Sequence, residues 1–541
     1  MEKYRTSIFN DVIGPVMRGP SSSHAAASVR IGQMLKMAAR NKIVKAAVDY
    51  DINGSLAETH DGQGSDMGLA AGFLGLEMTD PKMPGAVEIA KTSGLDFQIN
   101  ILDYGAVHPN NYRIKTFAAD GNEHNWEAIS TGGGMIRIWR FNGFEIDIMG
   151  DYHELLVISD CKNTNYSGGE TACDARTEIE KLIPDFEYIS ESHGTGVAHN
   201  GQVCINIKTT SKIEDETINK ITALAHVREL IQMYPVLPTL SKKGCTVPYS
   251  NAEELLQYTK DNKRNMWELA AYYESIRGNI SENEVFEKMA DIADIFINCV
   301  KEGLAGTSYK DRILGPEAHL IEKGIKEKTL LPSDLLNNII KNITAIMEVK
   351  SSMGIIVAAP TAGSCGCLPG TILGIGETLN LSKEELVKAL LASALVGVFI
   401  ANKSGFAAEV AGCQVECGAG SAMAAAGTVQ IMGGTVRQCI DAAAIALQNV
   451  SGLACDMVAN RTEVPCLGKN IMCGVNAAAA ATMAMAGFSN VIPLDETIEA
   501  ISDIGKSLPA SLRCTLGGLG KTGASQRIRE KLETEFGSHC R

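Results

Sequence analysis

Residues 412–427 read GCQVECGAGSAMAAAG, and this stretch decides how the second half of the chain folds. Beyond four larger side chains, it consists only of Gly, Ala, Ser and Cys. Residues 477–487 have a similar composition. Small side chains let helix backbones approach closely and pack at high density. The two stretches therefore predict a densely packed all-helical domain.

The surrounding sequence extends this pattern over the whole C-terminal half. Apolar residues recur at three- and four-residue spacing, which indicates amphipathic helices. This spacing occurs in residues 285–300, 333–347, 384–401 and 435–447. We therefore predict an all-α domain over residues 251–541.

Residues 1–150 have a different pattern. Short runs rich in β-branched and aromatic residues predict strands at 44–52, 97–102 and 135–139. Glycine-containing loops separate such runs, and loops often carry functional residues. These loops are residues 19–24, 62–66 and 132–134. The pattern predicts an α+β domain with polar loops.

Residues 151–240 predict a compact βαββαβ unit that resembles the ACT domain, a module that often binds amino acids. The predicted elements are strand 155–159, helix 172–182, strand 186–190, strand 203–209, helix 214–224 and strand 227–233. The Asp-x-Pro-Gly turn usual in that family is absent, because Asp160 is followed by Cys161. Residues 235–250 contain three prolines and predict a linker.

Bulk composition excludes several classes of protein. The chain has 541 residues, of which 45% are hydrophobic and 21% charged, a balance typical of folded globular proteins. Its net charge of −14 disfavours nucleic acid as a partner. The longest apolar run, residues 390–401, is shorter than the roughly 20 residues that span a bilayer. The N-terminus lacks the pattern of an export signal, so we expect a cytoplasmic protein without a membrane partner.

The cysteines point to the C-terminal half. There are fifteen of them, and ten lie from Cys365 to Cys540. An odd number in a chain without an export signal argues against structural disulfides and leaves free thiols or metal ligation.

Cys413, Cys455 and Cys466 each lie near a glycine or proline turn and are candidate ligands of an iron–sulfur cluster. Their spacing is not that of a ferredoxin, and spacing alone favours a structural role. For Cys365, Cys367 and Cys417, packing as small apolar groups is favoured over ligation.

Several motifs in order resemble the iron–sulfur L-serine dehydratases. Residues 412–416, 455–458, 463–466 and 359–364 (APTAGS) are similar to the large chain of that family. Five further motifs are similar to its small chain: residues 13–15 (IGP), 19–24 (GPSSSH), 54–59 (GSLAET), 108–110 (HPN) and 132–134 (GGG). The resemblance implies that two chains, separate in some members, are fused here.

The resemblance also implies an activity and a cofactor. A [4Fe-4S] cluster would be held by Cys413, Cys455 and Cys466, with one iron left open as a Lewis acid. The enzyme would dehydrate and deaminate L-serine to pyruvate and ammonia. In some relatives a C-terminal cysteine binds the open iron until substrate displaces it, and here that residue would be Cys540; a solvent-exposed thiol is the alternative.

The expected substrate contacts come from both halves of the chain. They are Ser22, Ser23, Thr361, Gly363 and Ser364. Loop 360–370 offers backbone N–H groups for a substrate carboxylate. We expect a small-molecule substrate and a homo-oligomer.

Two departures from the family pattern affect the substrate. Gln63 stands where the family has histidine, and glutamine cannot accept a proton at neutral pH. The base is then His24 or His60, and His24 is favoured because its motif is intact. Met457 replaces a proline that would fix φ after Cys455. The alternatives are β-elimination from another small hydroxy or thiol substrate, or a regulatory protein that keeps the cluster without turnover.

Overall fold

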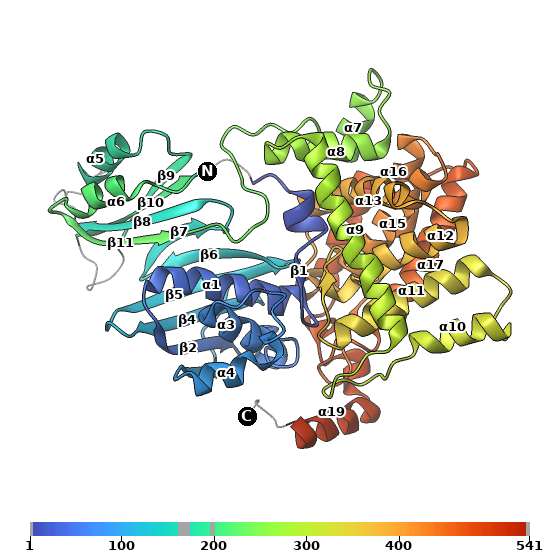
Figure 1. The fold of residues 1–541 in the computed structure, drawn as a ribbon, viewed down its shortest axis with the longest axis horizontal. Coiled ribbons are helices and arrows are strands. Elements are labelled where there is room, and N and C mark those ends of the chain that lie inside the picture. The colour runs from blue at the N-terminus through green and yellow to red at the C-terminus, as the bar shows by residue number, and fades with distance from the viewer. Residues whose placement is uncertain (1–3, 161–173, 195–200, 537–541) are drawn as a thin grey trace.

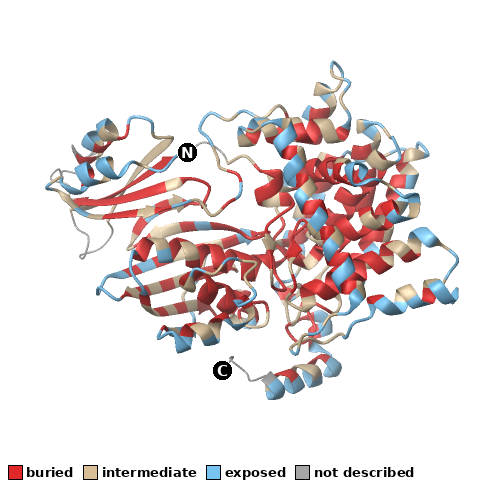
Figure 2. Cartoon of the chain, in the orientation of Figure 1, coloured by how far each residue is buried: buried red, intermediate tan, exposed pale blue. Residues whose placement is uncertain are grey.

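The computed structural model describes residues 4–160, 174–194 and 201–536, arranged as a strand-rich N-terminal part beside a mostly helical C-terminal part (Figure 1). Buried residues concentrate where the two parts meet and along the central helices (Figure 2). No helix within the described ranges combines the length and apolar character needed to cross a membrane.

The N-terminal part is built on a six-stranded sheet of order β3-β2-β4-β5-β6-β7. Its strands are β2 (Ile43–Asp51), β3 (Asp96–Leu102), β4 (Asn111–Ala118), β5 (Glu123–Gly132), β6 (Met135–Phe141) and β7 (Phe144–Ile148). Only β2 and β3 pair in parallel, because helices connect them. These helices are α2 (Leu56–Thr59), α3 (Ser65–Leu74) and α4 (Ala86–Thr92).

Helix α1 (Ala27–Ala39) and α3 pack together over one face of this sheet (Figure 1). Their contact is close because a Cβ at Gly72 would lie 2.5 Å from the Val29 carbonyl oxygen. The segment before α1, expected to be a loop, instead contains a π-helical turn, η2 (Ser22–Ala26). This turn continues directly into α1 and buries the serine–histidine motif.

The predicted βαββαβ order is confirmed for the described residues. The elements are β8 (His153–Asp160), α5 (Asp174–Leu182), β9 (Tyr188–His193), β10 (Gln202–Thr209), α6 (Asp215–Thr222) and β11 (Val227–Met233). The sheet is antiparallel with order β11-β8-β10-β9. Its side chains alternate between faces: Leu155 and Val157 pack under the two helices, whereas Leu156 and Ile158 join the core of the N-terminal sheet.

Helices fill the C-terminal part, and the four predicted from periodicity are confirmed as α9, α11, α13 and α16. The bounds are α7 (Ala252–Tyr258), α8 (Met266–Gly278), α9 (Glu282–Ala305), α10 (Ala318–Glu327), α11 (Asp334–Ser351), α12 (Cys367–Leu379), α13 (Lys383–Lys403), α14 (Ala408–Ala411), α15 (Cys417–Ile431), α16 (Val436–Gln448), α17 (Cys466–Met485), α18 (Leu494–Ser507) and α19 (Gly523–Phe536).

Helix α15, which contains the small residues of 418–427, lies at the centre and packs against α12, α13, α16 and α17. A Cβ at Gly427 would lie 2.2 Å from the Ser393 hydroxyl of α13, so only glycine allows this approach. The small residues of α15 therefore serve the close packing that their composition predicts.

The description of residues 251–541 as all-α is wrong in detail. Three short strands lie among the helices: β12 (Ile356–Val357), β13 (Cys455–Asp456) and β14 (Arg513–Thr515). Strand β12 pairs with β1 (Val16–Met17), and β13 pairs with β14. Periodicity does not reveal these strands because each has only two or three residues and is formed by a distant partner.

The N-terminal segment joins the two parts. The π-helical turn η1 (Ile8–Val12) packs in the helical core, not in the core of the N-terminal sheet. Val16 then pairs with Val357, a few residues before the 359–364 motif. This pairing brings the first residues of the sheet part beside a loop of the helical part.

Candidate active site

Each of the three predicted cluster cysteines lies at the start of a helix, strand or turn. Cys413 opens a 3-10 turn, η6 (Cys413–Val415), after Gly412 at φ 75°; Cys455 opens β13; Cys466 is the first residue of α17. All three side chains are buried. Residues at the ends of elements are held by the surrounding packing, which suits a group of ligands drawn from three segments.

Two of the three thiols lie together. Cys413 Sγ, Cys455 Sγ and a carboxylate oxygen of Glu416 lie within 4.8 Å of one another. Cys466 Sγ is outside this group, although it interacts electrostatically with Cys413. Thiolates that bind different corners of one cluster are held apart by the cluster itself, so the donor set fits an iron–sulfur centre in its chemistry.

The thiols differ in their ease of ionisation. Hydrogen bonds from Cys417 and Cys455 hold the pKa of Cys413 well below its usual range. Burial raises the pKa of Cys466 to about 12. Because the thiolate is the form that binds metal, Cys413 is the ligand best prepared before metal arrives.

The other candidate group, His24, comes from the sheet part and lies in turn η2. Its side chain is fully buried, and burial lowers its pKa to about 3, with a smaller contribution from His60. The imidazole is therefore neutral at physiological pH, but the same burial makes its lone pair a weaker proton acceptor than that of an exposed histidine.

Hydrogen bonds assign the tautomer of His24. The Thr59 hydroxyl donates to the Ser55 carbonyl at 2.7 Å, so its oxygen accepts from His24 Nε2–H at 2.8 Å. His24 Nδ1 is then the unprotonated nitrogen and accepts from the Ser21 hydroxyl at 2.9 Å. The basic atom is thus Nδ1.

Nδ1 faces Glu409, a residue of α14 that the sequence did not suggest. The distance from Nδ1 to Glu409 Oε1 is 3.6 Å, and burial raises the pKa of Glu409. Glu409 Oε2 is buried and has no hydrogen-bond partner in the described part of the chain. Buried polar atoms are usually paired, and the Asn110 side chain is a hydrogen-bonding neighbour that lowers the pKa of this carboxyl against the effect of burial.

A cavity of about 360 Å³ reaches this carboxylate. It is lined by residues of two predicted small-chain motifs, including Ser55 and His108, and by Arg513 of β14. Its size is within the range of small-molecule sites. Glu409 therefore lines a cavity large enough for a small molecule.

The predicted substrate loop of the helical part contacts Glu416, the carboxylate that lies with Cys413 and Cys455. Thr361 donates to Glu416 at 2.7 Å, and Ser364 caps the same short turn. The Ala362 N–H donates to Ser22 of the sheet part at 3.1 Å. A Cβ at Gly363 would lie 3.2 Å from the Glu416 carboxylate, which explains a glycine there.

Two of the remaining predicted site residues, Ser23 and His60, are buried. Ser23 is buried beside His24 in η2. His60 is buried with its Nδ1 2.6 Å from Asp66, so this nitrogen is engaged by a carboxylate. Cys540 lies outside the described residues. Cys365 and Cys367 are fully buried, as packing would require.

The two departures from the family pattern lie in contact. Gln63 Nε2 is 2.6 Å from Met457 Sδ and 3.5 Å from Cys514 Sγ, although Gln63 and Met457 are far apart in sequence. Cys514, at φ 59°, also hydrogen-bonds to Cys455. Sequence reasoning missed Cys514 because only the pairing of β13 with β14 brings it to the site.

Comparisons with known proteins show which chains this sequence is similar to. Residues 207–519 match the family model described as serine dehydratase alpha chain. The probable L-serine dehydratase alpha chain of Bacillus subtilis is 34% identical over 285 residues, which are 52% of this chain and 95% of that one. The L-serine dehydratase alpha chain of Peptoniphilus asaccharolyticus is 34% identical over 284 residues, 52% of this chain and 97% of that one.

The N-terminal part matches a second type of chain. The probable L-serine dehydratase beta chain of Bacillus subtilis is 37% identical over 233 residues, which are 43% of this chain and 99% of that one. Alpha-like and beta-like regions therefore occur in one polypeptide. The chain belongs to the serine dehydratase alpha-chain family and carries a beta-chain-like region fused in front of it.

Proposed function

We propose that this protein is an iron–sulfur L-serine dehydratase that converts L-serine to pyruvate and ammonia. The observation that carries this proposal is that Glu409 of the helical part lies 3.6 Å from His24 Nδ1 of the sheet part and interacts electrostatically with Cys413. Cys413 in turn is gathered with Cys455 and Glu416. The names of the alpha-chain and beta-chain relatives support the same substrate.

In this proposal Cys413, Cys455 and Cys466 hold a [4Fe-4S] cluster. When bound through three thiolates, such a cluster supplies an open iron that acts as a Lewis acid toward the substrate hydroxyl. Thr361, Gly363 and Ser364, with Ser22 and Ser23, surround the substrate carboxylate. Cys540 is proposed to occupy the open position until substrate arrives.

His24 is the proposed base. Nδ1 removes the α-proton of serine, and Thr59 holds Nε2–H so that the ring keeps this tautomer. Loss of that proton and of the β-hydroxyl gives 2-aminoacrylate, which tautomerises and hydrolyses to pyruvate and ammonia. Burial of the site limits competing water.

The remaining predictions belong to the same proposal. We propose three domains at residues 1–150, 151–240 and 251–541, of which the second is an ACT-like regulatory module. Its element and strand order support that assignment. We further propose that the enzyme is cytoplasmic and homo-oligomeric.

The test is an assay of protein purified without oxygen and reconstituted with iron and sulfide. L-serine, L-threonine and L-cysteine are supplied separately, and 2-oxo acid and ammonia are measured. Pyruvate and ammonia in equal amounts from serine are expected. A product from cysteine or threonine alone would move the assignment to β-elimination from another substrate. No product from any of the three, with iron and sulfide fully incorporated, would favour the non-catalytic regulatory protein.

A further inference from the structure

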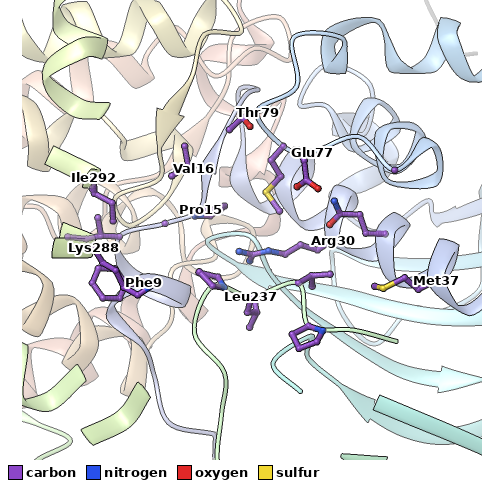
Figure 3. Close-up of a pocket in the computed structure, with 18 of the residues that line it drawn as sticks. Phe9, Pro15, Val16, Arg30, Met37, Glu77, Thr79, Leu237, Lys288 and Ile292 are labelled. Atoms are coloured by element: carbon purple, nitrogen blue, oxygen red, sulfur yellow. The ribbon is translucent and has the colours of Figure 1, made fainter. Parts of the chain in front are cut away.

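A second and larger cavity, of about 850 Å³, lies between α1, the linker that follows β11, and α9 (Figure 3). None of the candidate active-site residues lines it. Part of the wall is apolar, with Ile13, Val16, Leu237 and Ile292 among its residues. A concave, mostly apolar pocket of this size is typical of a small-molecule site.

The charges that line the cavity are mainly positive. The cationic side chains are Arg30, Lys36, Arg40 and Lys288, against two acidic ones, Glu77 and Asp291. Across the described ranges none of the six forms an ion pair within 4 Å. The lining therefore carries more positive than negative side chains, in a protein whose net charge is −14, with Asp11 acting on Arg30 and Glu284 on Lys288 from outside it.

Arg30 is the most unusual of these residues because it is charged and only 1% exposed. One guanidinium nitrogen donates to the Gly134 carbonyl at 2.6 Å, but Nε is buried without a hydrogen-bond partner in the described part of the chain. Burial lowers the pKa of Arg30 to about 10, although the Asp11 carboxylate opposes this shift. Asp11 compensates part of this buried charge, but the unbonded Nε leaves the guanidinium able to take a further partner.

Figure 3 shows the Arg30 side chain among the residues that line the pocket, with Leu237 and Pro15 nearby and Lys288 on the far side. A guanidinium fork pairs well with a carboxylate or phosphate, and the apolar wall fits the body of an organic molecule. We propose that this cavity binds a small organic oxyanion, a carboxylate or phosphate on an apolar body, with Arg30 as its main partner.

The cavity contacts elements that lead to the active site. Arg30 lies on α1, which continues directly from the turn that holds His24. Val16 pairs with Val357, which precedes the substrate loop. A molecule bound in this cavity would therefore contact elements that position both the His24 turn and the substrate loop, although it would lie outside the active site.

The experiment measures binding by ¹⁹F NMR of the reconstituted full-length protein, with 4-fluorobenzoate, 4-fluorophenyl phosphate and the neutral 4-fluorobenzamide as probes. We expect at least one anionic probe to bind more tightly than the amide. Arg30→Met should lower the affinity for that probe by about 30-fold or more, because the substitution removes the buried cation that pairs with its anionic group. The probe that binds more tightly identifies the oxyanion.

Two further variants keep the test independent of the folding of Arg30→Met. Lys36→Glu and Lys288→Glu change exposed residues at the rim and should each weaken binding by about two- to fivefold. Lys91→Glu, an exposed residue of α4 outside the cavity, should have no effect. Equal binding of the amide, binding insensitive to the rim variants, or no binding at millimolar concentration would overturn the proposal. Because binding is read without turnover, the result does not depend on whether serine is the substrate.

Discussion

The sheet side of the candidate site supplies nitrogen and oxygen groups joined by hydrogen bonds, whereas the helical side supplies sulfur and carboxylate groups. His24 has each ring nitrogen paired with a hydroxyl, from Ser21 and Thr59. Cys413 and Cys455 are instead gathered with Glu416. The sheet side is therefore organised before any cofactor binds, while the helical side groups donors whose natural partner is a metal.

The comparison also shows how one chain can replace two. In Bacillus subtilis the similar regions are named as separate alpha and beta chains. Here the sides are joined by the main-chain pairing of Val16 with Val357 and by the hydrogen bond from the Ala362 N–H to the Ser22 hydroxyl. Each side thus depends on the other for its position.

The largest effect should come from the sulfur side. Cys413→Ser removes the thiol most readily ionised, and we expect loss of most bound iron and a fall of activity to background. Iron and sulfide analysis with the visible absorbance of the cluster would measure this. Cys439→Ser, buried on α16 away from the site, is the control and should retain iron. Full iron content in Cys413→Ser would remove Cys413 from the ligand set.

Substitution of the histidine on the sheet side should lower turnover without changing the amount of bound iron. His24→Asn is expected to lower kcat by about 10²- to 10⁴-fold, because a general base is lost, with iron content unchanged. His60→Asn, whose ring is paired with Asp66, should have a smaller effect. A larger loss in His60→Asn than in His24→Asn would transfer the role of base to His60.

Lowering the pH should decrease the free energy of unfolding, because the buried His24 imidazole stays neutral in the folded protein. The pKa of His24 is 6.5 in the unfolded chain, and burial lowers it to about 3 in the folded protein. In this window the unfolded state binds more protons, so the contribution of His24 to stability is present above pH 6.5 and is lost as the pH falls. Relative to His24→Asn, the native protein should lose about 1.4 kcal/mol per pH unit. Anaerobic denaturant unfolding of both proteins measures the difference; a constant difference would mean that His24 is protonated when folded.

The smallest effect should appear where the two sides touch. Gln63 and Met457 are in contact, so Gln63→Leu and Met457→Leu should not be additive in free energy of unfolding, with a coupling of about 0.5–1 kcal/mol. The double-mutant cycle measures it. Gln63→Leu combined with Met289→Leu, a buried residue of α9, should be additive. Additivity in both pairs would show that the two departures act independently.

The candidate site residues could be proposed from the sequence because they lie in short motifs that resemble those of a known family, whereas the spacing of the cysteines alone favoured a structural role. The turn of His24 follows a run of serines, and Cys413 and Cys466 adjoin a glycine and a proline. Glu409, Thr59 and Cys514 were not predicted. Nothing in the local sequence around these three residues distinguishes them. Each contacts the site only because folding places it beside residues from another element.

By itself, the sequence determined the helical character of the second half, the βαββαβ order and the location of the thiols, because these depend on periodicity and residue type along the chain. Tertiary structure alone decided that Gln63 meets Met457 and Cys514, that Glu409 faces His24, and that Arg30 is buried in a second cavity. Those contacts join residues from different elements, and burial at such contacts sets their protonation and charge.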